Sequence, residues 1–160
     1  MTDHKPEQRF MLRAIEIARQ SVDANVGGPF GSVIVRGGEI IGEGTNRVTS
    51  TNDPTAHAEV VAIRDACTRL GTFQLDGCEI YATCEPCPMC LGAIYWARAD
   101  RVYIACTRQD ASAAGFDDEH IYSELALKHE QRRIPMTTAF RDEGLELFNH
   151  WIRKPDKIDY

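Results

Sequence analysis

Apolar residues recur along the chain at spacings that predict an alternation of helices and strands. Residues 7–25 predict a covering helix, because their apolar side chains recur every three or four positions. That stripe consists of Phe10, Met11, Ala14, Ile15, Ala18 and Val22. Two short apolar runs follow at 30–35 and 40–44, and Gly37-Gly38 between them is a two-residue hairpin signal. We expect an antiparallel pair of strands there.

The middle of the chain alternates helix and strand. Asp53 followed by Pro54 predicts the start of a helix that runs to Leu70, because Asp is a good capping residue and proline suits the first turn. Beyond that helix the pattern predicts, in order, a strand at 79–83, a helix at 86–98 and a strand at 101–106. A strand, a helix and a strand in succession favour a right-handed parallel crossover.

The last third of the chain is less regular. It predicts a loop at 110–118, a helix at 119–128, a fifth short strand at 134–140 and a final helix marked by Leu145, Phe148 and Ile152. A hairpin followed by a parallel crossover gives a mixed sheet, and the helices are long enough to cover both faces. We therefore expect one α/β domain over residues 1–160, a three-layer α/β/α sandwich with a mixed five-stranded sheet.

Composition and charge restrict the partners. The chain is 43% hydrophobic and 26% charged, and its net charge is −6. A protein that binds a nucleic acid usually presents a basic surface, so this balance favours a small uncharged substrate and no nucleic acid. No apolar stretch approaches the length of a membrane span, and residues 1–20 lack the pattern of a signal peptide. With six cysteines and no secretion signal, the expected location is the cytoplasm.

The candidate chemistry lies in two short motifs, His57-Ala58-Glu59 and Pro86-Cys87-Pro88-Met89-Cys90. Three protein ligands, His57, Cys87 and Cys90, would hold one Zn²⁺ and leave its fourth position open for water, as catalytic zinc sites do. Glu59 would not be a ligand. It would carry protons between the water, the substrate and the leaving group. Both motifs fall near predicted helix starts, whose positive ends favour thiolates.

The cysteines also allow sites of a different kind. Cys87 and Cys90 alone could form a redox pair or half of a structural zinc ribbon, although the sequence has no separate second CxxC. Cys84, three positions before Cys87, could be the fourth ligand of a structural site. We favour instead a buried spare thiol at the end of a strand. A purely structural site would have no use for Glu59, which separates the two hypotheses.

These motifs identify a resemblance to the cytidine-deaminase-like superfamily, and within it to the small, single-domain bacterial guanine deaminases. The resemblance covers nearly the full length. It depends on the segments 28–31, 52–59, 84–98 and 114–118 and on the terminal Tyr160. It implies zinc-dependent hydrolysis of guanine to xanthine and ammonia, in purine breakdown or salvage. It also implies a homodimer in which the C-terminal segment, about 120–160, is exchanged between subunits.

The resemblance further implies roles for individual residues. Asp118 would meet the 2-amino group and assist its departure. Asn46 and the backbone N–H of Ala58 would hydrogen-bond the purine. Phe30, Trp96 and Tyr160 would form the apolar walls and close the pocket.

On local grounds several of these assignments have simpler alternatives. Asn46 could be an ordinary turn residue, Phe30 and Trp96 could be core, and Asp118 could cap the helix after it. The zinc motifs are also shared with tRNA adenosine deaminases and some cytosine deaminases, which remain alternative functions. A tRNA enzyme would need a basic RNA-binding face, and its binding would depend steeply on salt.

Overall fold

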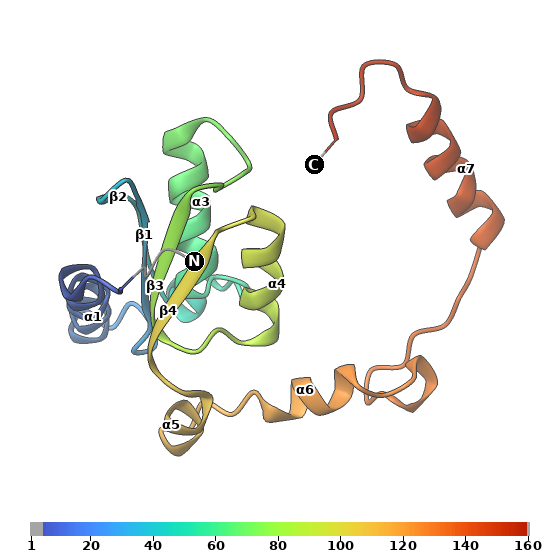
Figure 1. Cartoon of the computed structure of the whole chain (residues 1–160). Helices are drawn as coiled ribbons and strands as arrows, with labels where there is room; N and C mark the ends of the chain where they lie inside the picture. The colour runs from blue at the N-terminus through green and yellow to red at the C-terminus, as the bar shows by residue number, and fades with distance from the viewer. Residues whose placement is uncertain (1–4, 160) are drawn as a thin grey trace. The chain divides into compact units, whose positions relative to one another are not determined.

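The computed structural model describes residues 5–159, which form two compact units divided after Asp118. The first unit is built on a four-stranded sheet in the order β2-β1-β3-β4 (Figure 1). β1 pairs antiparallel with both β2 and β3, whereas β3 and β4 are parallel, so the predicted mixed sheet is confirmed. The strands are β1 (Gly31–Arg36), β2 (Glu39–Thr45), β3 (Cys78–Cys84) and β4 (Arg101–Cys106).

The β1–β2 hairpin forms where the sequence predicts it. Gly37 and Gly38 both adopt positive φ, 59° and 82°, a conformation that a type I′ turn requires at its two central residues. The pairing shifts by one residue between Ile34 and Val35, which is a bulge that the sequence pattern does not reveal.

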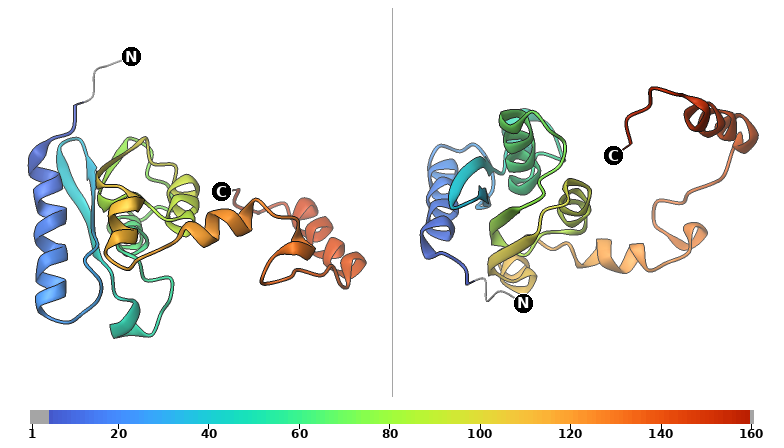
Figure 2. Two further views of the ribbon diagram at one scale, coloured as in Figure 1. Left: turned by 90° about the horizontal axis from the view of Figure 1, so that it is seen from below. Right: turned by 45° about the horizontal axis from the view of Figure 1, so that its top comes forward.

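Two hydrophobic clusters contact the sheet. Val33 and Val35 of β1 pack with α1 (Gln8–Asp23) through Phe10, whereas Ile34 packs with α3 (Ala58–Leu70) and α4 (Pro88–Ala97). Because successive side chains of a strand point to opposite faces, the clusters lie on opposite sides of β1. Figures 1 and 2 show α1 on one side of the sheet and α3 and α4 on the other.

Two glycines of β2 allow α3 to approach the sheet closely. A Cβ atom at Gly44 would lie 2.2 Å from the carbonyl oxygen of Ala58, and one at Gly42 would lie 2.7 Å from that of Ala62. Real Cβ atoms do not come this close to backbone, so only glycine fits at either position. The contact at Gly44 fixes the first turn of α3, which is the turn that follows His57.

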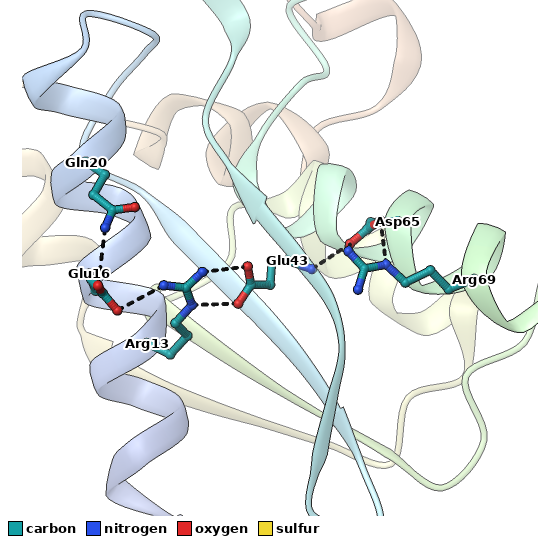
Figure 3. A network of polar contacts seen from close by, with 6 residues as sticks. All are labelled: Arg13, Glu16, Gln20, Glu43, Asp65 and Arg69. Atoms are coloured by element: carbon teal, nitrogen blue, oxygen red, sulfur yellow. Dashed lines mark hydrogen bonds and ion pairs between the residues drawn. The ribbon is translucent and has the colours of Figure 1, made fainter.

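A polar network ties α1 to β2 and β2 to α3 (Figure 3). The guanidinium of Arg13 donates to both carboxylate oxygens of Glu43, over 2.7 and 2.9 Å, and also to Glu16. These carboxylates raise the pKa of Arg13, with the hydrogen bond to Glu43 contributing most. The backbone N–H of Glu43 donates to Asp65 of α3, which satisfies one group on the outer edge of the edge strand.

The predicted start of α3 is wrong by several residues. The Asp53 side chain accepts hydrogen bonds from the N–H and the hydroxyl of Thr55, and these bonds make a local turn instead of a helix cap. The helix begins at Ala58, with His57 as its N-cap residue. A separate single turn, α2 (Val48–Thr51), precedes this segment.

The predicted fifth strand is also wrong, and the sheet has four strands. Residues 134–140 form no strand, and Ile134 and Phe140 are both 80% exposed. Pro135 lacks the N–H that a strand ladder needs, and Phe140 has a φ of 51°, outside the extended region. The apolar run has the composition of a strand but lacks a neighbouring strand to pair with.

The remaining elements follow β4. The first unit ends with α5 (Arg108–Ala113), which begins just before the segment predicted as a loop and extends into it. The second unit contains α6 (Glu119–Leu125), a 3-10 turn (His129–Gln131) and α7 (Arg141–Arg153). No described residue of this second unit is buried. Over residues 5–159, no helix combines the length and the apolar character that crossing a membrane would require.

Candidate active site

Two helix starts present the candidate ligands. His57 is the N-cap of α3 and Cys87 is the N-cap of α4, which begins at Pro88, two residues after the predicted start at Pro86. Both have extended backbone conformations, and neither side chain makes a capping hydrogen bond. An N-cap side chain usually accepts a bond from its own helix. Here both side chains are left available to bind something else.

The ligand atoms converge as the sequence predicts. The Nδ1 atom of His57 lies 3.6 Å from the Sγ of Cys87 and 3.5 Å from the Sγ of Cys90. Zn–N bonds of roughly 2.05 Å and Zn–S bonds of roughly 2.3 Å at a tetrahedral angle place N and S about 3.6 Å apart. Within residues 5–159, these three are the one group of His, Cys, Asp or Glu whose ligand atoms come close enough to hold a metal.

The pKa shifts of Cys87 and Cys90 are compatible with the binding of a cation. A hydrogen bond from Cys90 lowers the pKa of Cys87 to about 4, with a further contribution from His57. The same hydrogen bond and burial raise the pKa of Cys90. Without metal the site thus carries one thiolate and one thiol, and Zn²⁺ would replace the remaining proton. Two thiolates and one imidazole leave a fourth tetrahedral position for water.

Glu59 lies beside this cluster in the first turn of α3. Only 8% of its surface is exposed, although it is charged in its ordinary state. Burial raises its pKa, while its own backbone N–H and Cys90 act in the opposite direction. A carboxyl group with a raised pKa exchanges protons more readily near neutral pH, which suits a proton carrier.

Cys84 does not belong to the ligand group. It is buried at the end of β3, as expected for a spare thiol, and its Sγ donates to the carbonyl oxygen of Thr107 over 3.4 Å. Burial raises the pKa of Cys84 to about 11, so it is a neutral thiol at pH 7. The group that could hold a metal is therefore His57, Cys87 and Cys90.

Asn46 is hydrogen-bonded to the Gly28–Phe30 segment. Its Oδ1 accepts from the N–H groups of Gly28, at 3.4 Å, and Val48, at 3.3 Å, and its backbone N–H donates to the carbonyl oxygen of Phe30. The side-chain oxygen is thus engaged, which leaves the amide NH₂ to donate elsewhere. Ala58 is the first residue of α3, so its N–H has no partner within the helix.

Asp118 lies within electrostatic reach of the ligands. Burial raises the pKa of its carboxyl group, and the charge of Cys87 raises it further. Asp118 in turn contributes to the raised pKa of His57, after larger effects from Cys87 and Glu59. Phe116, two positions earlier, packs edge-on against the ring of Phe30. Phe116 belongs to the 114–118 motif but is not among the predicted site residues.

The structure does not bring Trp96 to the ligands within one chain. Trp96 is 67% exposed and lies in the last turn of α4, whereas Cys87 precedes the first. At 1.5 Å per residue, the two positions are about 13 Å apart along the helix axis. Tyr160, the other predicted wall of the pocket, lies outside the described residues.

Three protein donors would leave a zinc ion with one coordination position for water, and the carboxyl group of Glu59 lies buried beside them. This arrangement is typical of a catalytic zinc site, whereas a structural site usually has four protein donors. Residues 4–106 match the family described as the cytidine and deoxycytidylate deaminase zinc-binding region, and the chain belongs to this family. It is 52% identical over 153 residues to a guanine deaminase of Bacillus subtilis (strain 168), covering 96% of this chain and 98% of that protein. The X-ray structure of the Bacillus subtilis guanine deaminase superposes with a TM-score of 0.94 at 51% identity, over 98% of this chain and 99% of the other.

Two further relatives match a smaller share of the chain. A tRNA-specific adenosine deaminase of Aquifex aeolicus (strain VF5) is 51% identical over 127 residues, which are 79% of this chain and 81% of the relative. The structure of a guanine deaminase from Nitrosomonas europaea has a TM-score of 0.67 at 34% identity, over 72% of this chain and 66% of the other. The guanine deaminase of Bacillus subtilis and the tRNA enzyme of Aquifex aeolicus are almost equally identical to this chain where they align. The alignments differ in extent, because they cover 96% and 79% of the chain, respectively.

Proposed function

We propose that the protein is a zinc-dependent guanine deaminase that hydrolyses guanine to xanthine and ammonia. One observation supports this most strongly: the similarity to the Bacillus subtilis guanine deaminase covers 96% of the chain and so includes the C-terminal unit. The zinc-ligand cluster and the adjacent Glu59 provide the chemistry that such a reaction needs. Water supplies the oxygen of xanthine, and the 2-amino group leaves as ammonia.

His57, Cys87 and Cys90 would hold the zinc ion, which when bound lowers the pKa of a coordinated water to near neutrality. Glu59 would take a proton from that water and deliver it to the ring nitrogen next to C2. Its burial supports this role, since a carboxyl group shielded from solvent transfers its proton to the substrate rather than to bulk water. Asp118 would receive the 2-amino group and hold a proton for the departing ammonia.

Binding of the base would use neutral donors and apolar surfaces. The NH₂ group of Asn46 would donate to an acceptor on the purine edge, because the Oδ1 atom is already engaged by two backbone N–H groups. The N–H of Ala58 would provide a second donor. Phe30 would form one apolar wall, and Trp96 and Tyr160 would complete the enclosure.

The assembly we propose is a homodimer with exchanged C-terminal segments. In the second unit no described residue is buried, and Leu147, Phe148 and Ile152 of α7 are between 66% and 69% exposed. An amphipathic helix rarely remains uncovered, because burial of each large apolar side chain contributes about 1.5–3 kcal/mol. Tyr95 and Trp96 of α4 are also exposed, and a partner subunit would cover them. Trp96 could then serve the site of that partner.

We further infer a three-layer α/β/α arrangement and a cytoplasmic location. The two clusters on opposite sides of β1 support the layering. All six cysteines are free, as is usual in a reducing compartment.

A tRNA adenosine deaminase is the second candidate, because the identity to the Aquifex aeolicus enzyme is 51% where the two sequences align. The net charge of −6 argues against it, since RNA binding relies on neutralising phosphates.

The experiment is a substrate panel with the zinc-loaded protein. Guanine, adenine, cytosine and a tRNA bearing the target adenosine would be incubated separately, and ammonia and product would be measured. We expect xanthine and ammonia from guanine, and little reaction elsewhere. Deamination of tRNA, with a rate that falls steeply as salt increases, would replace the proposal by the second candidate.

A further inference from the structure

We infer that Phe116 is a positioning residue that locks the 114–118 loop against Phe30 and thereby holds Asp118 at the metal site. The inference rests on the proposed function and deepens it, because it assigns the means by which Asp118 is kept in place. Phe116 itself would not touch the substrate. It would act through Asp118.

The contact is specific in its geometry. The ring centroids of Phe30 and Phe116 lie 4.9 Å apart with an angle of 85° between the planes, which is the edge-to-face arrangement that aromatic rings prefer. The neighbouring Gly28 lies against the same ring: a Cβ atom built there would be 3.4 Å from Phe116, an ordinary contact distance. Phe116 therefore packs against the Gly28–Phe30 segment, although 43% of its surface remains exposed.

Local backbone hydrogen bonds give the loop its shape. The N–H groups of Ala114, Gly115 and Phe116 all donate back to carbonyl oxygens of α5. Gly115 has a φ of 90° and turns the chain away from the helix. These bonds shape the loop, but they do not connect it to the Gly28–Phe30 segment.

The other end of α5 is anchored separately. Thr107 and Asp110 form a capping box at the start of the helix, and the N–H of Arg108 donates to Glu85 over 3.2 Å. Glu85 follows β3 and lies two positions before Cys87. The start of α5 is thus fixed near the metal ligands, and the ring contact of Phe116 fixes the chain again beyond its end. Asp118 follows Phe116 by two residues.

Phe30 also connects this loop to Asn46, another predicted site residue. Phe30 joins Asn46 through a backbone hydrogen bond and joins Phe116 through its ring. A single short segment therefore supports both the residue that would bind the purine edge and the loop that would meet the amino group. Loss of Phe116 would disturb only the second of these.

The test compares Phe116→Ala, Phe116→Tyr and a matched control, Phe73→Ala. Phe73 is 49% exposed in the same unit, so its removal costs similar surface at a place outside the site. We expect Phe116→Ala to lower kcat by roughly 10- to 100-fold, because small displacements of a catalytic group cost this much. KM should change less than about threefold, and zinc content should stay at one per chain. Phe116→Tyr, which keeps the ring, and Phe73→Ala should retain activity.

A double-mutant cycle with Asp118→Asn decides whether Phe116 acts through Asp118. If it does, Phe116→Ala should have little further effect on kcat in the Asp118→Asn background. An undiminished effect there, or a wild-type kcat in Phe116→Ala, would overturn the inference. Hydrogen exchange of the 114–118 amides gives a readout without substrate: exchange should accelerate in Phe116→Ala but not in Phe73→Ala. A failure of the proposed function would appear separately, as a wild-type protein that does not convert guanine.

Discussion

The Nδ1 atom of His57 lies 3.5 Å from the Sγ of Cys90, although the two residues are 33 positions apart and belong to the starts of different helices. Neither helix could form the site alone. Their relative position is set by packing against the sheet, with α3 pressed onto β2 and α4 sharing a cluster with α3. The zinc affinity should therefore respond to changes in packing that touch no ligand.

Gly44→Ala tests this dependence. The new Cβ would meet the carbonyl oxygen of Ala58 at 2.2 Å and the backbone nitrogen of Ala62 at 2.4 Å, neither of which can rotate away. We expect the free energy of unfolding to fall by about 3 kcal/mol, and zinc affinity to fall as the start of α3 is displaced. Guanidinium unfolding and a competitive zinc titration would measure the two effects.

Gly92→Ala is the control for that substitution. Gly92 lies inside α4, and apart from its chain neighbours and the backbone of its own helix no heavy atom lies within 4 Å of the Cβ that it would gain. Alanine is the better helix residue by about 0.5–1 kcal/mol, so this variant should be as stable as the wild type or slightly more stable. Equal stability of the two variants would show that α3 does not need its close approach to β2.

Glu59→Gln tests the proton carrier. Glutamine has nearly the same shape and cannot exchange a proton, so we expect one zinc per chain and a kcat for guanine lower by roughly 10³-fold or more. Zinc content and xanthine production would be measured on the same preparation. Glu16→Gln, on α1, should leave both values unchanged. A Glu59→Gln enzyme with wild-type turnover would remove Glu59 from the mechanism.

The parts of this site that are local in sequence could be predicted, and those that depend on tertiary contacts could not. The grouping of His57, Cys87 and Cys90 could be predicted because helix starts and ligand spacing leave a signal within a few residues, whereas the role of Glu59 stays a prediction. The start of α3 was misplaced because the side chain of Asp53 bonds to Thr55, two residues on, and this bond competes with capping. The ring contact of Phe30 with Phe116 joins distant segments and has no sequence signal of its own.

The strands show the same limit. The hairpin was predictable from Gly37 and Gly38, whose positive φ values are a local requirement. The supposed strand at 134–140 had an apolar pattern but no partner, and pairing cannot be judged from one segment alone. In the second unit, apolar side chains that indicate a core in the sequence remain exposed within one chain.

Cys84→Ser tests the number of zinc ligands. Because Cys84 is a buried neutral thiol bonded to Thr107, this variant should still bind one zinc per chain. Cys87→Ser, which removes a ligand, should lose zinc affinity by several orders of magnitude. Atomic absorption after dialysis against a weak chelator would compare the two. If Cys84→Ser also lost its zinc, four protein donors would be indicated, and the open position for water would not exist.

The pKa of Cys84 predicts a loss of stability in alkali. Burial raises the pKa of this thiol from 9.0 to about 11. Both folded and unfolded chains keep the proton below pH 9, and only the unfolded chain loses it as the pH rises towards 11. The stability of the wild type should thus decline over this interval relative to that of Cys84→Ala. Unfolding midpoints of both proteins at pH 8 and at pH 10.5 would show a difference that shrinks with pH; a constant difference would contradict the raised pKa.

The C-terminal tail should be needed for turnover but not for the metal. Ile158 is 71% exposed and Asp159 is exposed as well, so removing these two residues takes away no buried side chain. We expect this deletion to lower guanine turnover at least about tenfold, because an open site admits water. Zinc content should not change. Lys154→Ala, four residues before the deleted segment, is the control. Full activity of the deletion variant would exclude a closing role for the tail.

A mixing experiment then decides whether the tail acts within its own chain or on a partner. The Glu59→Gln chain has an intact tail, and the 158–160 deletion chain has an intact Glu59. Each variant alone should be nearly inactive. In a hybrid dimer with exchanged segments, the tail of the Glu59→Gln chain closes the site of the deletion chain. That site then has both Glu59 and a tail, whereas the other site has neither. Co-refolded mixtures should therefore recover a substantial part of the wild-type activity. Because no such site arises when each tail serves its own chain, mixtures that stay inactive while hybrids form would exclude the exchange.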